Sequence, residues 1–312
     1  MTLVIGGWGA GGPMGSVDYL TPVRPRCPAP AQPAARYRAL PSLPHEAMVG
    51  GSECSAAYTG AALMTCTSGS SFLTPYGWIY SPGTCYNYSF GGGWRGAGGA
   101  LASYRRGASL VRLGPYLLAL GGRRKRRSYN SVEVSGVVAR AQVLDSRAPG
   151  RGWRVSRQLE MPAGVAEHCA VTVAGGPGGR ELLVTGGRGR GARVMKLNLR
   201  TKTWYSLHRL EEGRRRHACT KVTLNGRPGV VVSGGASSTS ANSTSVEFYD
   251  SSSGQWFTLP PLQVRVVVFM EKVLTSPQRG RRSHAMTVQG GRMVVTGGLQ
   301  VTGHPFTTLF TY

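Results

Sequence analysis

Arginine is the residue type in this chain whose number and spacing best suit a chemical role. The 312 residues include 37 Lys and Arg against 13 Asp and Glu, which gives a formal net charge of +24. The basic runs stand beside apolar, strand-like stretches, and they are RRKRR (123–127), RGR (188–190), RRR (214–216) and RGRR (279–282). A guanidinium group binds carboxylate or phosphate in a forked geometry. The runs therefore predict a positive face for an anionic partner, and the alternative is biased composition on solvated loops.

Histidine is the second residue type that could do chemistry. His217 and His284 recur at one place after an Arg-rich stretch, whereas His168 falls one residue out of this phase. A repeated His could bind a metal or transfer a proton, but repetition at one motif position favours a structural role. No paired carboxylates have a spacing suited to glycoside hydrolysis, and no Cys/His spacing suits zinc. We therefore expect no catalytic residue, no metal site and no cofactor.

The six cysteines are too few for a disulfide scaffold in a chain of this length, so we expect buried free thiols. Cys169 and Cys219 are assigned to the same place in successive repeats, and Cys54 and Cys66 could pair in an oxidising compartment. No apolar stretch is long enough to predict a membrane span. The N-terminus has no signal-peptide layout, and an intracellular location is favoured over secretion.

A repeated element that ends in a glycine pair positions these residues. Apolar runs that end in Gly-Gly recur along the chain, at Gly6-Gly7, Gly121-Gly122, Gly186-Gly187, Gly234-Gly235 and Gly297-Gly298. The three runs that end at Gly122, Gly187 and Gly235 are each followed by a second strand-like run and then by a tryptophan, which is Trp153, Trp204 or Trp256. Glycine permits a positive φ where a strand must turn sharply, and we expect the Trp rings to pack between neighbouring sheets. The pattern predicts a unit of four short strands, with the glycine pair closing the second strand and Trp on the fourth.

This order of strand, Gly-Gly, strand and Trp resembles the kelch repeat, in which ~50 residues form one blade of a β-propeller. The resemblance implies an all-β fold with about six four-stranded blades, in one domain that spans 1–312. The blades are predicted at 1–44, 48–101, 104–162, 165–210, 214–262 and 281–312, with an insertion at 263–280. NSVEV (130–134) is predicted as a third strand. Because unit one lacks a first strand and unit six lacks a fourth, the ring is expected to be incomplete or open at the chain ends.

The resemblance also implies a function. Kelch propellers act as protein-interaction modules, as substrate adaptors or as scaffolds, and some bind acidic peptides at one end of the central channel. In those proteins, the residue after Gly-Gly and the residue before the first strand face the channel. In this chain these positions carry Arg123, Arg188, Arg216 and Ser283. The expected partner is a protein that presents an acidic peptide or an actin-like acidic surface.

Two other functions remain open at this point. The charge also fits a propeller that binds nucleic acid or another polyanion, whose affinity would fall steeply with salt. The galactose-oxidase family is similar in blade pattern and holds copper with two Tyr and two His, with a Cys crosslinked to one Tyr. Cys85 and Tyr86 are adjacent here, but no Tyr and His pair carries the copper motif over. We therefore expect a protein that is not an enzyme.

Overall fold

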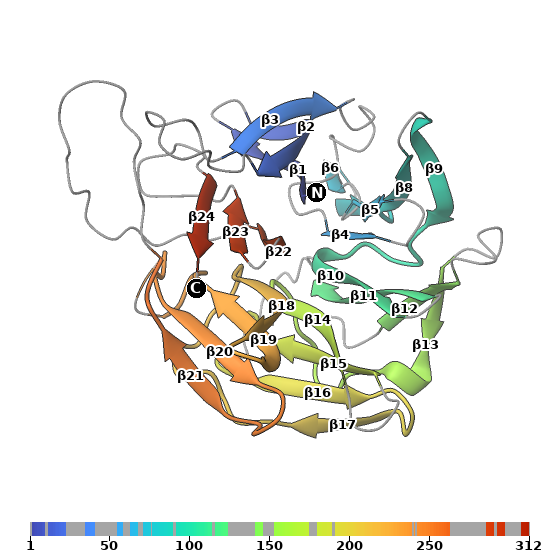
Figure 1. Ribbon diagram of the computed structural model, residues 1–312. Coiled ribbons are helices and arrows are strands. Elements are labelled where there is room, and N and C mark those ends of the chain that lie inside the picture. The colour runs from blue at the N-terminus through green and yellow to red at the C-terminus, as the bar shows by residue number, and fades with distance from the viewer. Residues whose placement is uncertain are drawn as a thin grey trace.

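The computed structural model is built from β-strands (Figure 1). It describes residues 2–9, 12–22, 35–40, 55–58, 63–67, 71–75, 77–89, 92–113, 116–123, 141–145, 153–174, 180–188, 191–238, 240, 242–262, 285–289, 292–296 and 307–311. Apart from one 3-10 turn, η2 (Arg157–Leu159), every regular element in these ranges is a strand. The fold is therefore all-β, as the sequence predicts. None of the described segments forms a helix that is long and apolar enough to cross a membrane.

The strands form six antiparallel sheets, which we number in chain order, and one separate hairpin. Sheet 1 contains β1 (Thr2–Gly9), β2 (Gly12–Pro22) and β3 (Ala35–Leu40). Sheet 2 contains β4 (Ser55–Tyr58), β5 (Leu63–Cys66), β8 (Thr84–Ser89) and β9 (Gly93–Ala100), and the hairpin is β6 (Ser71–Thr74) with β7 (Gly77–Tyr80). Sheet 3 contains β10 (Arg106–Leu113), β11 (Tyr116–Arg123), β12 (Ala141–Asp145) and β13 (Arg154–Ser156).

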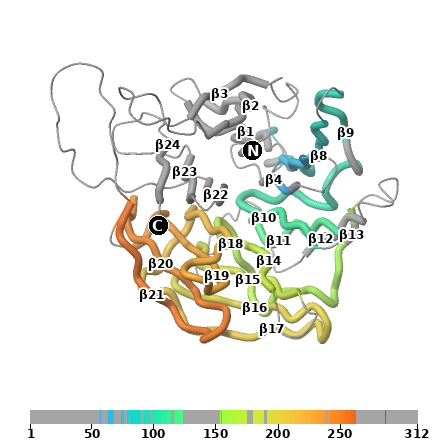
Figure 2. The backbone as a smooth tube through the Cα atoms, viewed as in Figure 1, coloured from blue at the N-terminus to red at the C-terminus, as the bar shows by residue number. Residues whose placement is uncertain are grey.

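The remaining sheets repeat the same strand order. Sheet 4 contains β14 (Cys169–Ala174), β15 (Arg180–Thr185), β16 (Val194–Asn198) and β17 (Thr203–Ser206). Sheet 5 contains β18 (Ala218–Leu224), β19 (Arg227–Ser233), β20 (Val246–Asp250) and β21 (Trp256–Leu259). Sheet 6 contains β22 (Ala285–Gln289), β23 (Arg292–Thr296) and β24 (Thr307–Thr311). Each strand of sheets 3, 4 and 5 pairs with the next one along the chain, so these sheets are plain meanders, and Figure 2 traces sheets 4 and 5 in succession.

The first strands of sheets 2 to 6 are neighbours in chain order. Contacts join β4 to β10, β10 to β14, β14 to β18, β18 to β22, and β22 to β1. In Figure 1 the first strands β10, β14 and β18 lie towards the middle of the molecule, and the fourth strands β13, β17 and β21 lie at its periphery. The second strands β11, β15 and β19 are covered on both faces, and this explains why Leu182–Val184 and Val230–Val232 are continuously apolar and buried.

The repeated tryptophans pack between neighbouring sheets, as predicted. Trp153 lies in a core cluster with Met64 of sheet 2 and Leu117 of sheet 3. Trp204 packs against the cluster between sheets 3 and 4, and Trp256 packs against the cluster between sheets 4 and 5. Trp204 and Trp256 stand on the fourth strands β17 and β21, whereas Trp153 comes one residue before β13.

The first glycine of two described pairs lies close to the backbone of the neighbouring unit. Gly186 has φ +60°, and a Cβ there would lie only 2.3 Å from the carbonyl oxygen of Arg214 in the neighbouring unit. Gly121 has the same φ, and its Cβ would lie 2.2 Å from the Val165 carbonyl oxygen. Both the backbone conformation and the space therefore demand glycine. Gly297 and Gly298 lie outside the described residues.

Three details of the predicted units are wrong. The third strand of sheet 3 is β12 (Ala141–Asp145), which pairs with β11, and it is not the 130–134 run, which lies outside the described residues. The AQVLD segment that forms β12 has three apolar residues in five, whereas NSVEV has two. Sheet 2 carries the β6–β7 hairpin between its second and third strands, which the repeat pattern does not contain. His168 is in phase with His217. The residue after each histidine pairs with the residue directly before a glycine pair: Cys169 pairs with Thr185, and Ala218 pairs with Ser233.

The described cysteines form two disulfides, so the prediction of free thiols is wrong. Cys66 pairs with Cys85, its partner across β5 and β8, and not with Cys54. Cys169 pairs with Cys219 and joins the first strands of sheets 4 and 5. These two cysteines differ by one repeat position, because Cys169 is the first residue of β14 and Cys219 is the second residue of β18. That offset brings them together across the gap between adjacent first strands.

Candidate functional site

The candidate site is a group of four arginines around one buried carboxylate, which we call the Glu167 cluster. Arg123 Nη2 lies 3.3 Å from Glu167 Oε1, and Arg188 Nη1 lies 3.7 Å from the same oxygen. Arg215 Nη1 donates to Oε2 over 3.1 Å. Arg216 Nη2 donates to Oε1 over 3.3 Å, and its Nε lies 3.3 Å from Oε2. Four guanidinium groups and one carboxylate leave three positive charges in excess.

Three sheets contribute to the Glu167 cluster through repeated positions. Arg123 and Arg188 each follow a glycine pair, at the end of the second strand in sheets 3 and 4. Glu167 stands two residues before β14, and Arg215 and Arg216 stand just before β18. The cluster therefore lies at the end of the sheets where second strands finish and first strands begin.

A backbone chain of hydrogen bonds fixes the order of these positions. The Glu167 N–H donates to the Gly107 carbonyl over 2.8 Å, and the Arg216 N–H donates to the Glu167 carbonyl over 2.8 Å. Gly107, Glu167 and Arg216 all have a positive φ, of 67°, 57° and 55°. The left-handed conformation is costly for residues other than glycine. Glu167 and Arg216 adopt it although they are not glycines, so the geometry of the repeat fixes the backbone at this position.

The Glu167 side chain is only 1% exposed, yet it is ionised at neutral pH. Burial alone would raise its pKa, but the charges of Arg216, Arg123 and Arg215, with the hydrogen bond from Arg215, outweigh burial and hold the pKa below its ordinary value. A buried carboxylate that lacked such partners would be expensive. The surrounding arginines therefore stabilise the charge of Glu167, and Glu167 in turn offsets part of their repulsion.

The four arginines differ in their access to solvent. The side chains of Arg188 and Arg215 are 49% and 38% exposed, whereas those of Arg216 and Arg123 are 24% and 12% exposed. Arg188 and Arg215 reach opposite oxygens of one carboxylate from two different sheets. Their outward surfaces are the part of the cluster that an anion from solution can reach.

Two other arginines at the starts of first strands have a structural role. Arg214 is buried and donates from Nη1 to the Gly234 carbonyl over 2.9 Å, and its Nη2 lies 2.5 Å from Glu247 Oε1. Arg105 is equally buried and donates from Nη1 to the Gly121 carbonyl over 2.7 Å. Each of these two side chains donates a hydrogen bond to the carbonyl of the first glycine in the pair of its own unit. Only two residues of the RRR run (214–216) therefore belong to the Glu167 cluster.

The repeated histidines lie in the interior between sheets. His217 Nε2 lies 2.8 Å from Thr185 Oγ1, within hydrogen-bonding distance. In the preceding unit Leu120 occupies the position of Thr185, and neither ring nitrogen of His168 has a hydrogen-bond partner. Burial lowers the pKa of His168 from 6.5 to about 4, so the ring is neutral. These contacts support a structural role for both histidines; His284 lies outside the described residues.

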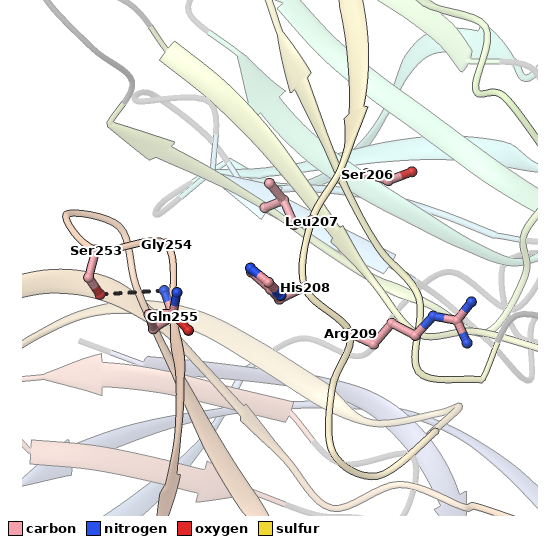
Figure 3. A pocket seen from close by; sticks show the side chains of 7 residues that line it. All are labelled: Ser206, Leu207, His208, Arg209, Ser253, Gly254 and Gln255. Atoms are coloured by element: carbon pink, nitrogen blue, oxygen red, sulfur yellow. Dashed lines mark hydrogen bonds between the residues drawn. The ribbon is translucent and has the colours of Figure 1, made fainter.

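An open groove lies between sheets 4 and 5 (Figure 3), and no residue of the Glu167 cluster lines it. The segment after β17 forms one side and the turn before β21 forms the other. Its lining residues are Ser206, Leu207, His208, Arg209, Ser253, Gly254 and Gln255. No partner residue expected from the sequence lines this groove.

Among the described residues no group of three or more His, Cys, Asp or Glu is placed to hold a metal ion.

The structure brings together three of the four residues that the sequence predicts as partner-binding. Arg123, Arg188 and Arg216 meet at Glu167, and Ser283 lies outside the described residues. Sequence reasoning missed Glu167 and Arg215. The signal for Glu167 was present in the sequence: alignment of His168 with His217 places Glu167 in the column of Arg216.

Comparison with protein-family models finds no match for this chain, and comparison with curated proteins finds no significantly similar sequence.

Proposed function

We propose that this chain is a kelch-type β-propeller that acts as a non-enzymatic module and binds an acidic segment of a partner protein at the Glu167 cluster. The observation that carries the proposal is the convergence of four arginines from three successive sheets on one buried carboxylate. Three positive charges remain in excess there, and Arg188 and Arg215 are partly exposed. Such an arrangement suits forked recognition of carboxylate groups. An adaptor or scaffold role would use the same surface.

The propeller architecture is supported by the repeated strand order and by the contacts between sheets. Sheets 3, 4 and 5 share one four-stranded meander, and the first strands of sheets 2 to 6 neighbour one another in sequence order. The contact between β22 and β1 joins the last sheet to the first. Sheets 1 and 6 have three described strands each, so a closed ring would have two shorter blades.

The alternative with a specific observation behind it is non-specific polyanion binding, because the net charge is +24. Such binding depends on the number of charges and much less on their arrangement. The copper-enzyme alternative has no supporting observation, since the Cys85 sulfur is bonded to Cys66 and not to a tyrosine.

The test uses two double variants of equal charge. Arg188→Gln/Arg215→Gln changes the exposed arms of the Glu167 cluster, and Arg180→Gln/Arg200→Gln removes two exposed arginines elsewhere. Calorimetric titration with a short synthetic peptide of consecutive glutamates should show an affinity loss of about tenfold or more for the first variant, and about twofold for the second. Equal losses would support polyanion binding and would refute the proposed site.

A further inference from the structure

Glu167 is an acidic residue at the centre of a site that we expect to bind acids. Its side chain is 1% exposed, and both carboxylate oxygens face arginines. A partner carboxylate therefore cannot take the position between Arg123 and Arg216 unless Glu167 leaves. Glu167 cannot leave easily, because its N–H and carbonyl are hydrogen-bonded to Gly107 and Arg216. The partner anion must bind as a second anion, on the outer side of the cluster.

The four guanidinium groups need a central anion to stay together. Like charges that all lie within 4 Å of the same two oxygens repel one another strongly where the surroundings are partly buried. Arg188 and Arg215 are partly exposed, so without the Glu167 charge they would move into water, where repulsion is screened. Long arginine side chains also lose rotamer freedom when they are held in place. Glu167 offsets both costs before any partner arrives.

We propose that Glu167 is a positioning residue: its carboxylate assembles the four arginines, so that Arg188 and Arg215 together receive one oxyanion group, a carboxylate or a phosphate, from the partner. The inference rests on the proposed function. It adds that Glu167 pairs with the arginines before the partner binds, and that the partner supplies one compact oxyanion group. The lowered pKa of Glu167 agrees with a carboxylate that keeps its charge at every physiological pH.

An assembling role for Glu167 and an effect of total charge predict opposite changes in affinity when Glu167 is neutralised. Neutralisation of Glu167 raises the net charge by one, and a surface that attracted anions only through its total charge would then bind them more tightly. If Glu167 assembles the site, the same substitution weakens binding. The sign of the change therefore separates the two accounts.

The experiment compares Glu167→Gln with Glu181→Gln, which makes the same change in charge. Glu181 pairs with Lys196 over 3.0 Å and stands near the start of β15, whereas Arg188 follows the end of that strand. The probes are inorganic phosphate and the glutamate peptide, titrated separately, which distinguishes phosphate from carboxylate recognition. Glu167→Gln should lose at least about tenfold in affinity for the probe that the wild type binds, and Glu181→Gln should stay within about twofold. Unchanged or tighter binding by Glu167→Gln would overturn the inference.

A second variant covers the case in which Glu167→Gln does not fold. Glu167→Asp keeps the net charge but withdraws the carboxylate by one methylene group. A positioning role predicts weaker binding by this variant, whereas an effect of total charge predicts the wild-type affinity. Wild-type affinity in Glu167→Asp would therefore overturn the inference.

A measurement without any probe separates this inference from the proposed function. Arginine side-chain Nε–Hε signals in NMR spectra should be ordered for Arg188 and Arg215 in the wild type, and should broaden or disappear in Glu167→Gln but not in Glu181→Gln. If that pattern is found and the wild type binds neither probe, the proposed function fails while the assembling role of Glu167 stands. If the signals do not change in Glu167→Gln, the inference fails.

Discussion

Replacement of Gly186 by Ala tests how closely neighbouring sheets approach at the glycine pair. Gly186 has φ +60°, and a Cβ would lie 2.3 Å from Arg214 O, 2.7 Å from His217 Cε1 and 3.3 Å from Gly191 O. Gly226, at the tip of the β18–β19 hairpin, has φ +78° and would place a Cβ with nothing within 4 Å. The two substitutions share the strain of a left-handed backbone and differ in the space available.

The expected magnitudes follow from these distances. A left-handed conformation costs an alanine about 1–2 kcal/mol, and this is the whole expected loss for Gly226→Ala. At Gly186 the Arg214 carbonyl must also move away, which adds about 1–3 kcal/mol for overpacking. The same movement of the Arg214 carbonyl weakens the hydrogen bond that Gly187 N–H donates to Arg214 O over 2.9 Å. This is a further loss of about 0.5–1.5 kcal/mol. Gly186→Ala should therefore lose about 3–6 kcal/mol of the free energy of unfolding.

Urea unfolding followed by tryptophan fluorescence measures both losses, because Trp204 and Trp256 pack at the two faces of sheet 4. The wild-type protein and both variants should be compared through the free energy of unfolding in water. Equal destabilisation by Gly186→Ala and Gly226→Ala would show that only backbone strain matters. It would refute the close packing of sheets 4 and 5 described above.

Three further predictions concern stability. Arg214→Ala should lower the free energy of unfolding by about 3–5 kcal/mol, because it leaves the buried Glu247 without its cation. The control Arg200→Ala, at an exposed position, should lower it by no more than about 0.5 kcal/mol. Similar melting temperatures for the two variants would contradict the buried ion pair. His168 is neutral when folded, with a pKa of about 4, but its unfolded form takes up a proton below its ordinary pKa of 6.5. The contribution of His168 to the free energy of unfolding should therefore fall by roughly 3 kcal/mol between pH 6.5 and pH 4, so the wild type should lose that much more than His168→Leu; calorimetry across that range in both proteins decides the point. The Cys169–Cys219 disulfide closes a loop of 50 residues, so Cys169→Ala/Cys219→Ala should lower stability by about 4 kcal/mol under oxidising conditions, and peptide mapping that finds both thiols free would contradict this pairing.

The repeated strands could be predicted because their signals are local. A buried second strand needs continuous apolar residues, and the turn after it needs glycine, so VVVSGG and LLVTGG mark the same element in sheets 5 and 4. The third strand of sheet 3 could not be placed in this way. Its position depends on which segment after the basic run pairs with β11, and both NSVEV and AQVLD are short runs with β-branched apolar residues.

The candidate site could be predicted only in part, because its chemistry depends on the direction of each side chain. The three arginines of the RRR run look equivalent in the sequence, yet Arg214 is buried against Glu247 and Arg216 pairs with Glu167. The disulfide between Cys169 and Cys219 also depends on the spatial offset between two first strands. Glu167 could have been predicted by aligning the repeats on their histidines, because His168 follows Glu167 as His217 follows Arg216.

The measurement that tests the central claim most directly is an NMR titration of the arginine side chains in the wild-type protein with the glutamate peptide. The account predicts that the Nε–Hε signals of Arg188 and Arg215 shift and saturate together, while those of the exposed Arg180 and Arg200 stay in place. Parallel shifts of all exposed arginines that do not saturate would contradict a specific site at the Glu167 cluster.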